Sequence, residues 1–176
     1  MFHRRSTLVL VAAAAAFLVQ VVSTDAYARR VDLEVGVGGI LPIEDNAPID
    51  AGPNYVLSTA IELSKSIDLE LGGAMGRVRN SSTKDLEDIY QVTGGFRINA
   101  SGEPGDTTRF FISLGGGYFD NFPPDDDGAM LYIAPGFRVQ VGEQTGVVLR
   151  LSVMRRASGP DTTLLLPSLQ WFHSWE

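Results

Sequence analysis

The sequence predicts an all-β chain that folds as an eight-stranded antiparallel up-and-down barrel and spans a membrane. Apolar residues alternate with small or polar residues in eight separate segments. Most of these segments have about the 9–11 residues that a tilted strand needs to cross a bilayer. The N-terminus adds a short apolar segment that is typical of an exported chain.

The first 28 residues have the layout of a cleavable signal peptide. Arg4 and Arg5 precede an apolar run over residues 8–22, and the small residues Ala26 and Ala28 follow it. This run is short for a membrane helix, which needs about 20 residues. We therefore predict a signal peptide over residues 1–28 and a single barrel domain over residues 29–176.

The amino-acid composition argues against some classes of function. The chain of 176 residues has a formal net charge of −7 and no cysteine. It can form no disulfide bond, and its acidic balance argues against a nucleic-acid partner, whose phosphates require a basic surface. No cofactor is expected.

The clearest segment is a long hairpin over residues 129–156. Its two arms alternate over residues 130–141 and 147–156, and the glycine-bounded turn 142–146 joins them. Each arm is longer than the usual strand of about 5–6 residues. Pro135 lies inside the first arm, and Pro167 lies inside the last segment of the chain. Because proline removes a ladder hydrogen bond, we expect a local bulge at each.

The other segments follow the same alternation, and the connections between them differ in length. In order, these segments are residues 31–41, 54–64, 67–76, 90–98, 110–118 and 165–175. The connections 42–53, 77–88 and 119–128 are long, polar and acidic, whereas the turn at Lys65 and Ser66 is tight. Long connections at one end and tight turns at the other are typical of a membrane barrel.

The two faces of the segments indicate which side meets lipid. One face carries Phe, Tyr, Trp, Leu and Ile, and the other carries mostly Gly, Ala and Ser with a few charges. An eight-stranded barrel has an interior only just wide enough for side chains. The bulky face is therefore predicted to point outward into lipid. A soluble sandwich or a secreted lipocalin-like binding protein, with the bulky face inward, is the alternative.

Charged residues on the inward face form the best candidate site. Five acidic residues of the first three segments and three arginines of later segments should meet in the lumen as a salt-bridge plug, because buried charges must be paired. These residues are Asp32, Glu34, Glu62, Asp68, Glu70, Arg97, Arg138 and Arg150. A gated proton or ion path is the alternative interpretation.

Outward aromatic residues are predicted to form two girdles at the membrane interfaces. The outer girdle would contain Tyr55, Tyr90 and Tyr118, and the inner girdle Phe96, Phe110, Trp171 and Trp175.

Neither a metal site nor a catalytic site is predicted. The acidic run Asp125 to Asp127 lacks the spacing of a calcium loop. His173 and Ser174 are adjacent in a strand, so their side chains should point to opposite faces. A lipid-modifying acyl hydrolase is the enzymatic alternative.

The exported barrel resembles the small eight-stranded outer-membrane proteins of the OmpA transmembrane-domain and OmpX type. The resemblance covers the chain after residue 28, and it includes a C-terminal strand, LLLPSLQWFHSWE, that looks like an assembly signal although it ends in Glu176. It implies a monomer in the bacterial outer membrane, in contact with lipid and lipopolysaccharide and assembled by the barrel-assembly machinery. The predicted function is structural or surface-interacting, with a closed lumen and no catalysis. A small-ligand-binding or ion-conducting barrel is an alternative.

Overall fold

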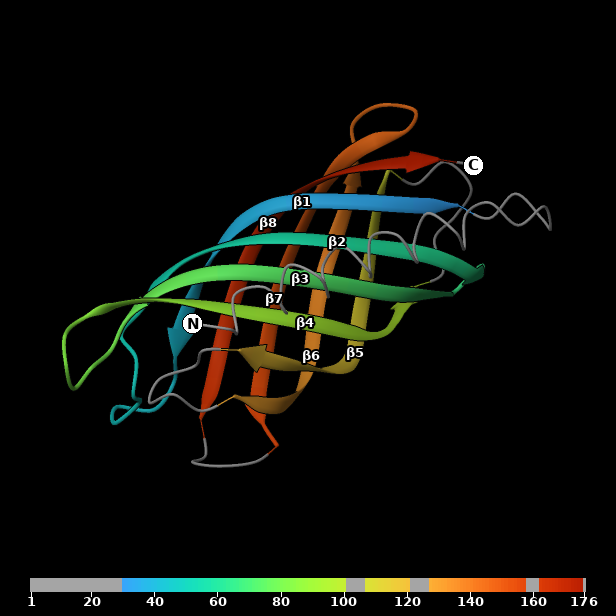
Figure 1. Cartoon of the computed structure of the whole chain (residues 1–176). Coiled ribbons are helices and arrows are strands. Elements are labelled where there is room, and N and C mark those ends of the chain that lie inside the picture. The colour runs from blue at the N-terminus through green and yellow to red at the C-terminus, as the bar shows by residue number, and fades with distance from the viewer. Residues whose placement is uncertain (1–29, 101–106, 121–126, 158–161, 176) are drawn as a thin grey trace, which may run out of the picture.

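The computed structural model describes residues 30–100, 107–120, 127–157 and 162–175, which form one closed antiparallel barrel (Figure 1). Each strand pairs with its neighbours in the chain, and β1 closes the barrel against β8. The strands are β1 (Val31–Pro42), β2 (Gly52–Ser64), β3 (Ile67–Arg79), β4 (Leu86–Asn99), β5 (Thr108–Asp120), β6 (Gly128–Gln140), β7 (Thr145–Arg156) and β8 (Thr163–Trp175). The predicted fold class is confirmed, and the predicted signal peptide lies outside the described residues.

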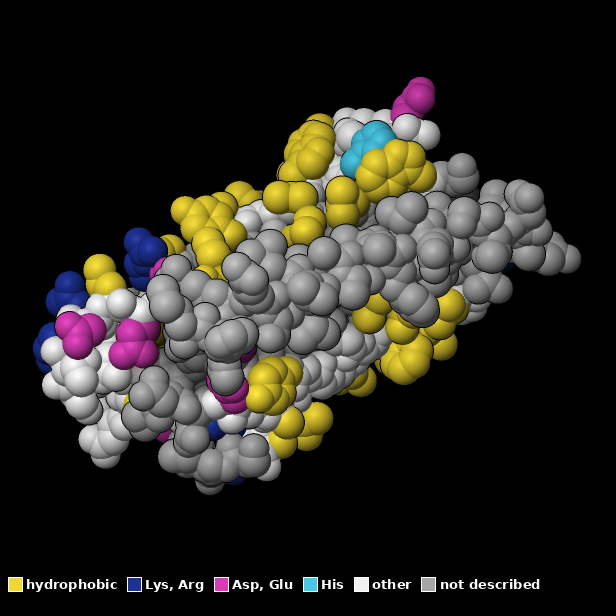
Figure 2. Space-filling view, in the orientation of Figure 1, with side chains coloured by type: hydrophobic (Ala, Val, Ile, Leu, Met, Phe, Trp, Pro, Cys, Tyr) yellow, Lys and Arg dark blue, Asp and Glu magenta, His cyan; other side chains and the backbone are white. Residues whose placement is uncertain are grey.

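Burial alternates along the strands, as the sequence predicts. In β6, Leu131 is 65% exposed and its neighbour Met130 is 1% exposed, although both side chains are apolar. Position in the pleat therefore decides which side a residue faces. Figure 2 shows hydrophobic side chains on the flank of the barrel, with most of the visible acidic and basic side chains at one end. Within the described ranges, no helix is long and apolar enough to cross a membrane.

The two ends of the barrel differ in the length of their connections. We call the end where β1 begins and β8 ends the terminal mouth, and the opposite end the loop mouth. At the loop mouth, β3 and β4 continue as a paired hairpin from Arg77↔Asp88 to Arg79↔Leu86. The sequence prediction of a loop over residues 77–88 was therefore wrong, because cross-strand pairing extends almost to the tip.

The two prolines inside strands interrupt the ladders without shifting them, so the prediction of bulges was wrong. Pro135 pairs with Ile112 of β5, and the β6–β7 pairing is missing there but keeps the same register on either side. Pro167 pairs with Leu151 of β7, and the β1–β8 pairing has a similar gap. A strand residue directs its N–H toward one neighbouring strand, so proline removes hydrogen bonding on that side only. Between the strands that the structure describes, one register shift occurs, between Glu62 and Ser64 in the β2–β3 pair.

Candidate functional site in the barrel lumen

Four charged side chains fill the middle of the lumen. Glu34 of β1 and Glu70 of β3 face Arg97 of β4 and Arg150 of β7, because all four lie on the inward face of their strands. The arginine nitrogens lie 2.6–3.3 Å from the carboxylate oxygens, and each arginine pairs with both acids. All four side chains are at most 7% exposed. Two acids and two bases make this inner ion cluster neutral, which is what burial of charge requires.

Neutral side chains complete the coordination of the inner ion cluster. The hydroxyl of Ser58 donates a hydrogen bond to Glu34 Oε2 at 3.0 Å, and that of Ser113 donates to Glu70 Oε2 at 2.8 Å. The guanidinium of Arg97 lies 4.5 Å from the ring centre of Phe111. A Cβ atom on Gly136 would lie 2.4 Å from that ring, so only glycine leaves room for it. Small residues on the inward face thus make space for a few large ones.

A second group of charges lies nearer the terminal mouth. Asp32 forms an ion pair with Arg138, and the hydroxyl of Ser174 both donates to Asp32 and accepts from Arg138, at 2.6 and 2.8 Å. The guanidinium of Arg138 stacks over the ring of Phe172 at 3.8 Å. Six residues, counting Arg30, Asp32, Glu62, Asp68, Asn99 and Arg138, make up this outer ion cluster.

Arg30 is the charged member of the outer ion cluster that the sequence did not predict, and Asn99 is the uncharged one. Its guanidinium lies 3.5–3.6 Å from carboxylate oxygens of Asp32, Glu62 and Asp68. Asp68 also accepts a hydrogen bond from Asn99 at 2.9 Å. Arg30 precedes β1 by one residue, so the strand pattern did not include it. The available signal was its place in the sequence, since Arg30 directly precedes the first strand and lies at the same barrel end as three inward acids.

The structure brings most of the predicted plug residues together, but in two groups instead of one. Glu34, Glu70, Arg97 and Arg150 form the inner group, and Asp32 and Arg138 pair in the outer one. Among the described residues, Asp68 and Glu62 have Arg30 as their ion partner and none of the three predicted arginines. The side chain of Glu62 is 31% exposed, so it lies at the rim of the lumen.

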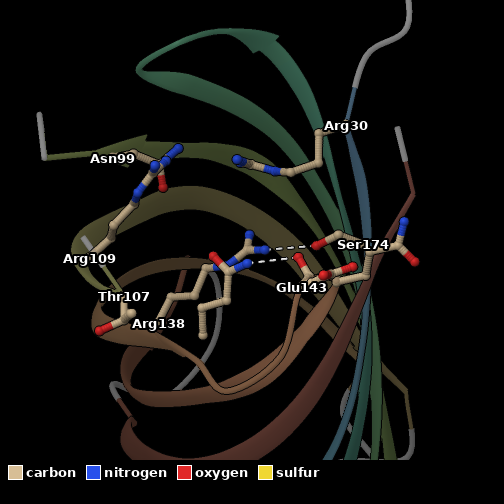
Figure 3. Close-up of a pocket in the computed structure, with 9 residues that line it drawn as sticks. Arg30, Asn99, Thr107, Arg109, Arg138, Glu143 and Ser174 are labelled. Atoms are coloured by element: carbon tan, nitrogen blue, oxygen red, sulfur yellow. Dashed lines mark hydrogen bonds between the residues drawn. The ribbon is translucent and has the colours of Figure 1, made fainter. Parts of the chain in front are cut away.

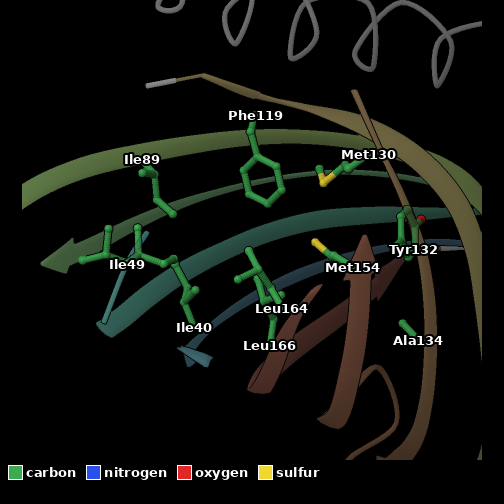
Figure 4. Close-up of a cluster of buried hydrophobic side chains, with 11 residues drawn as sticks. Ile40, Ile49, Ile89, Phe119, Met130, Tyr132, Ala134, Met154, Leu164 and Leu166 are labelled. Carbon is green, nitrogen blue, oxygen red and sulfur yellow. The ribbon is translucent and has the colours of Figure 1, made fainter. Parts of the chain in front are cut away.

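An apolar cluster fills the half of the lumen toward the loop mouth (Figure 4). The sequence places several of its members on the inward face, but it did not predict a cluster, because that face is mostly small with a few charges. Its members are Ile40, Ile49, Val78, Ile89, Phe119, Met130, Tyr132, Ala134, Met154, Leu164 and Leu166. Each is at most 6% exposed. The lumen therefore has a charged half, in which Phe111, Val148 and Phe172 pack among the ion pairs, and an apolar half.

The seven predicted girdle aromatics all lie on the outward face. Six of them are well exposed, and Tyr90 is half-buried. His173 lies beside this group, with its ring 4.5 Å from that of Trp175 in an edge-to-face contact. Their role at a membrane interface stays a prediction.

The described residues contain no arrangement that resembles a hydrolase site. The Ser174 hydroxyl points into the lumen and is bonded to Asp32 and Arg138, whereas His173 is on the outward face. No group of three or more His, Cys, Asp or Glu that could hold a metal ion occurs in these ranges.

Comparison with known proteins finds solved structures with a similar fold. No protein-family model matches the sequence, and no curated protein matches it. Solved outer-membrane barrels do match in structure. The outer membrane protein OprG of Pseudomonas aeruginosa aligns with a TM-score of 0.61 at 15% identity, over 85% of this chain and 97% of that one. Ail, the attachment invasion locus protein of Yersinia pestis, aligns with a TM-score of 0.57 at 14% identity, over 85% and 100%.

The outer membrane enzyme PagL also aligns, with a TM-score of 0.53 at 14% identity, over 81% of this chain and 98% of that one. At such identities the likeness concerns the fold. This chain has the fold of the small eight-stranded outer-membrane barrels.

Proposed function

We propose that the chain is a monomeric integral protein of the bacterial outer membrane, with a closed lumen and a structural or surface-interaction role. The proposal rests on a burial pattern that is the opposite of the one in a soluble protein. Charged residues such as Glu34 and Arg97 are buried, whereas bulky apolar residues of every strand are exposed. One exposed example from each strand is Val35, Leu57, Met75, Phe96, Leu114, Leu131, Leu149 and Trp171. A soluble monomer rarely exposes an apolar patch above about 300–600 Å².

The proposed partners follow from the same surface. Outer-membrane lipid and lipopolysaccharide would cover the apolar flank, and the girdle aromatics would lie at their headgroups. The barrel-assembly machinery would recognise β8, whose outward face carries Leu169, Trp171 and Trp175. A closed barrel satisfies the backbone groups of a strand within lipid, which an open sheet cannot do.

Membrane residence can be tested by fractionation and electrophoresis. The folded chain should stay with the outer-membrane fraction until detergent is added, and its mobility in mild detergent should change on boiling. Release into buffer without detergent would instead support the soluble lipocalin-like alternative.

A closed lumen predicts that the protein does not conduct ions. Water-filled channels require about 16–18 strands, whereas an eight-stranded barrel is filled by side chains. Here the inner ion cluster and the apolar cluster close the lumen at successive levels. We expect no sustained conductance in planar bilayers, either for the wild type or for Arg150→Ala, because the apolar cluster remains. Sustained wild-type current would overturn the closed lumen and support the ion-path alternative.

The β3–β4 hairpin is the part that we assign to surface interaction. The connection between β1 and β2 packs along it through backbone hydrogen bonds from Asp50 to Arg79 and from Ser81 to Pro48, at 2.8 and 2.9 Å. The hairpin carries charges of both signs, including an Arg77–Asp88 ion pair at 2.7 Å. This ordered, polar projection contrasts with the apolar flank. The similar barrel Ail is named for attachment and invasion, and we propose a comparable contact role here.

Cysteine labelling tests the orientation of the hairpin, since the chain has no native cysteine. Thr83→Cys at the hairpin tip should react with a membrane-impermeant maleimide on intact cells. Ser66→Cys, in the β2–β3 turn at the other end, is the matched control and should react only after the outer membrane is opened. The reverse pattern would reject the proposed orientation.

Catalysis is not part of the proposal, and a direct assay tests that exclusion. PagL shows that an enzyme can have this fold, but His173 and Ser174 lie on opposite faces of β8 here. Mass spectrometry of lipid A from cells with and without the protein should show identical acylation. A change that His173→Ala abolishes would make the chain a lipid-modifying enzyme.

A further inference from the structure

Three arginines border a pocket in the terminal mouth that the inner ion cluster does not reach. The pocket has a volume of about 140 Å³, and its polar lining includes Arg30, Arg109, Arg138, Asn99 and Gln140. Figure 3 shows Arg109 and Asn99 on one side and Ser174 and Glu143 on the other, with Arg30 reaching in from the start of β1. A single water occupies about 30 Å³, so the space is large enough for several waters or a small anion.

The charges around this pocket are unevenly compensated. Arg30 and Arg138 have carboxylate partners deeper in the lumen, as described above. Arg109 has no ion pair with any described residue, although it is half-buried. Among the described residues, Glu143 is the single carboxylate that lines the pocket, and no arginine pairs with it. Arg109 is therefore the arginine of the pocket wall whose charge no described carboxylate compensates, whereas Asp32, Glu62 and Asp68 balance Arg30 and Arg138.

Strand pairing forces two of these arginines together. Arg109 of β5 lies directly opposite Arg138 of β6. Side chains in such positions start about 4.5–5.5 Å apart, and like charges there are destabilising. Arg138 turns toward Asp32 and Ser174, which leaves Arg109 facing the pocket without a counter-charge among the described residues. An anion held between them would remove the repulsion.

We propose that this pocket binds a phosphate group, with Arg109 as its principal ligand. Guanidinium groups donate paired hydrogen bonds that match phosphate oxygens. The side-chain amides of Asn99 and Gln140, which each donate one N–H to Asp68 or to the Glu143 carbonyl, have a second N–H beside them. The phosphate could belong to an anionic phospholipid at the inner leaflet or to inorganic phosphate in the periplasm. The lipid source rests on the proposed membrane function, whereas the pocket itself belongs to the barrel fold.

Calorimetric titration with inorganic phosphate tests the site directly. The full exported chain, folded in a zwitterionic detergent and free of phosphate, should bind phosphate with an affinity that falls as NaCl is raised. Arg109→Gln should weaken binding at least tenfold, and Arg109→Lys should weaken it less. Arg79→Gln removes the same charge at the opposite end of the barrel and should leave binding unchanged. Equal binding by the wild type and Arg109→Gln would overturn the proposal.

Reconstitution distinguishes the two sources of phosphate. In vesicles of phosphatidylcholine with added phosphatidylglycerol, native mass spectrometry should detect the anionic lipid retained by wild type and lost in Arg109→Gln. Phosphate binding without such retention assigns the site to the free anion. Binding of neither ligand by a correctly folded barrel rejects the site but leaves the proposed function intact. If the protein needs no detergent, the proposed function fails, and the phosphate titration still decides on the pocket.

Discussion

The half of the lumen near the terminal mouth is filled by ion pairs, whereas the half near the loop mouth is filled by aliphatic and aromatic side chains. Both halves are closed, but they depend on different physics. In the inner ion cluster, two arginines balance two acids and each arginine contacts both acids, so the loss of one group leaves a buried charge without full compensation. In the apolar half, the loss of one side chain removes packing in proportion to its volume. A single substitution should therefore lower the free energy of unfolding sharply in the charged half, and in proportion to the lost side-chain volume in the apolar half.

Removal of Arg97 should have the largest effect on stability. Arg97→Met keeps the bulk of the side chain but leaves Glu34 and Glu70 with Arg150 alone. We expect the free energy of unfolding in urea, measured in detergent micelles, to fall by about 3–5 kcal/mol.

A second substitution separates the charge from the packing. Glu34→Gln in the Arg97→Met background restores neutrality and should recover part of the lost free energy. A double variant as unstable as the single one would show that packing, and not charge balance, holds this half together.

Truncation in the apolar half should have an intermediate effect. Leu164 is 1% exposed among the apolar cluster, and Leu164→Ala should cost about 2–4 kcal/mol of unfolding free energy. Leu165→Ala removes the same atoms from the outward face and serves as the matched control. Equal losses for the two variants would contradict the assignment of Leu164 to a packed lumen.

Removal of an exposed ion pair should have the smallest effect. Arg77 and Asp88 form an ion pair at 2.7 Å on the hairpin, but their side chains are 61% and 34% exposed. Solvent screens such pairs, so Arg77→Gln should leave the urea midpoint unchanged within error. A clear drop would mean that the hairpin supports the barrel as a whole.

The sequence predicted the charged half better than the apolar half. The reason is that the two faces of a strand differ clearly in polarity in the charged half but not in the apolar half. Asp32 and Glu34 alternate with Val31, Leu33 and Val35, so their face is unambiguous. In the last strand, Leu164, Leu165 and Leu166 are apolar on both faces, so alternation gives their parity but no contrast that shows which apolar side chains pack together. Phe111 likewise follows Phe110, and its place over Gly136 depends on a strand 25 residues later.

Partner choice within the site could not be predicted from single strands. Strand parity places Asp68 and Glu62 inward, but it does not say how far each lies from a given arginine. The register of β1 to β3 decides this, and it brings Arg30 to both acids. The prolines were misjudged for a related reason, since their effect depends on which neighbouring strand the missing N–H would have faced.

The two ladder gaps at Pro135 and Pro167 have a consequence for the motions of the barrel wall. Backbone amides beside a gap lack one flank of the cooperative ladder, so they should open locally without unfolding of the barrel. The gap at Pro167 interrupts the pairing between β1 and β8, so this seam consists of two separate hydrogen-bonded stretches. Hydrogen–deuterium exchange should be faster around Ile40 than around Val35, which lies in an unbroken stretch of the same seam. Local opening of the barrel wall would then be most frequent where β1 pairs with β8.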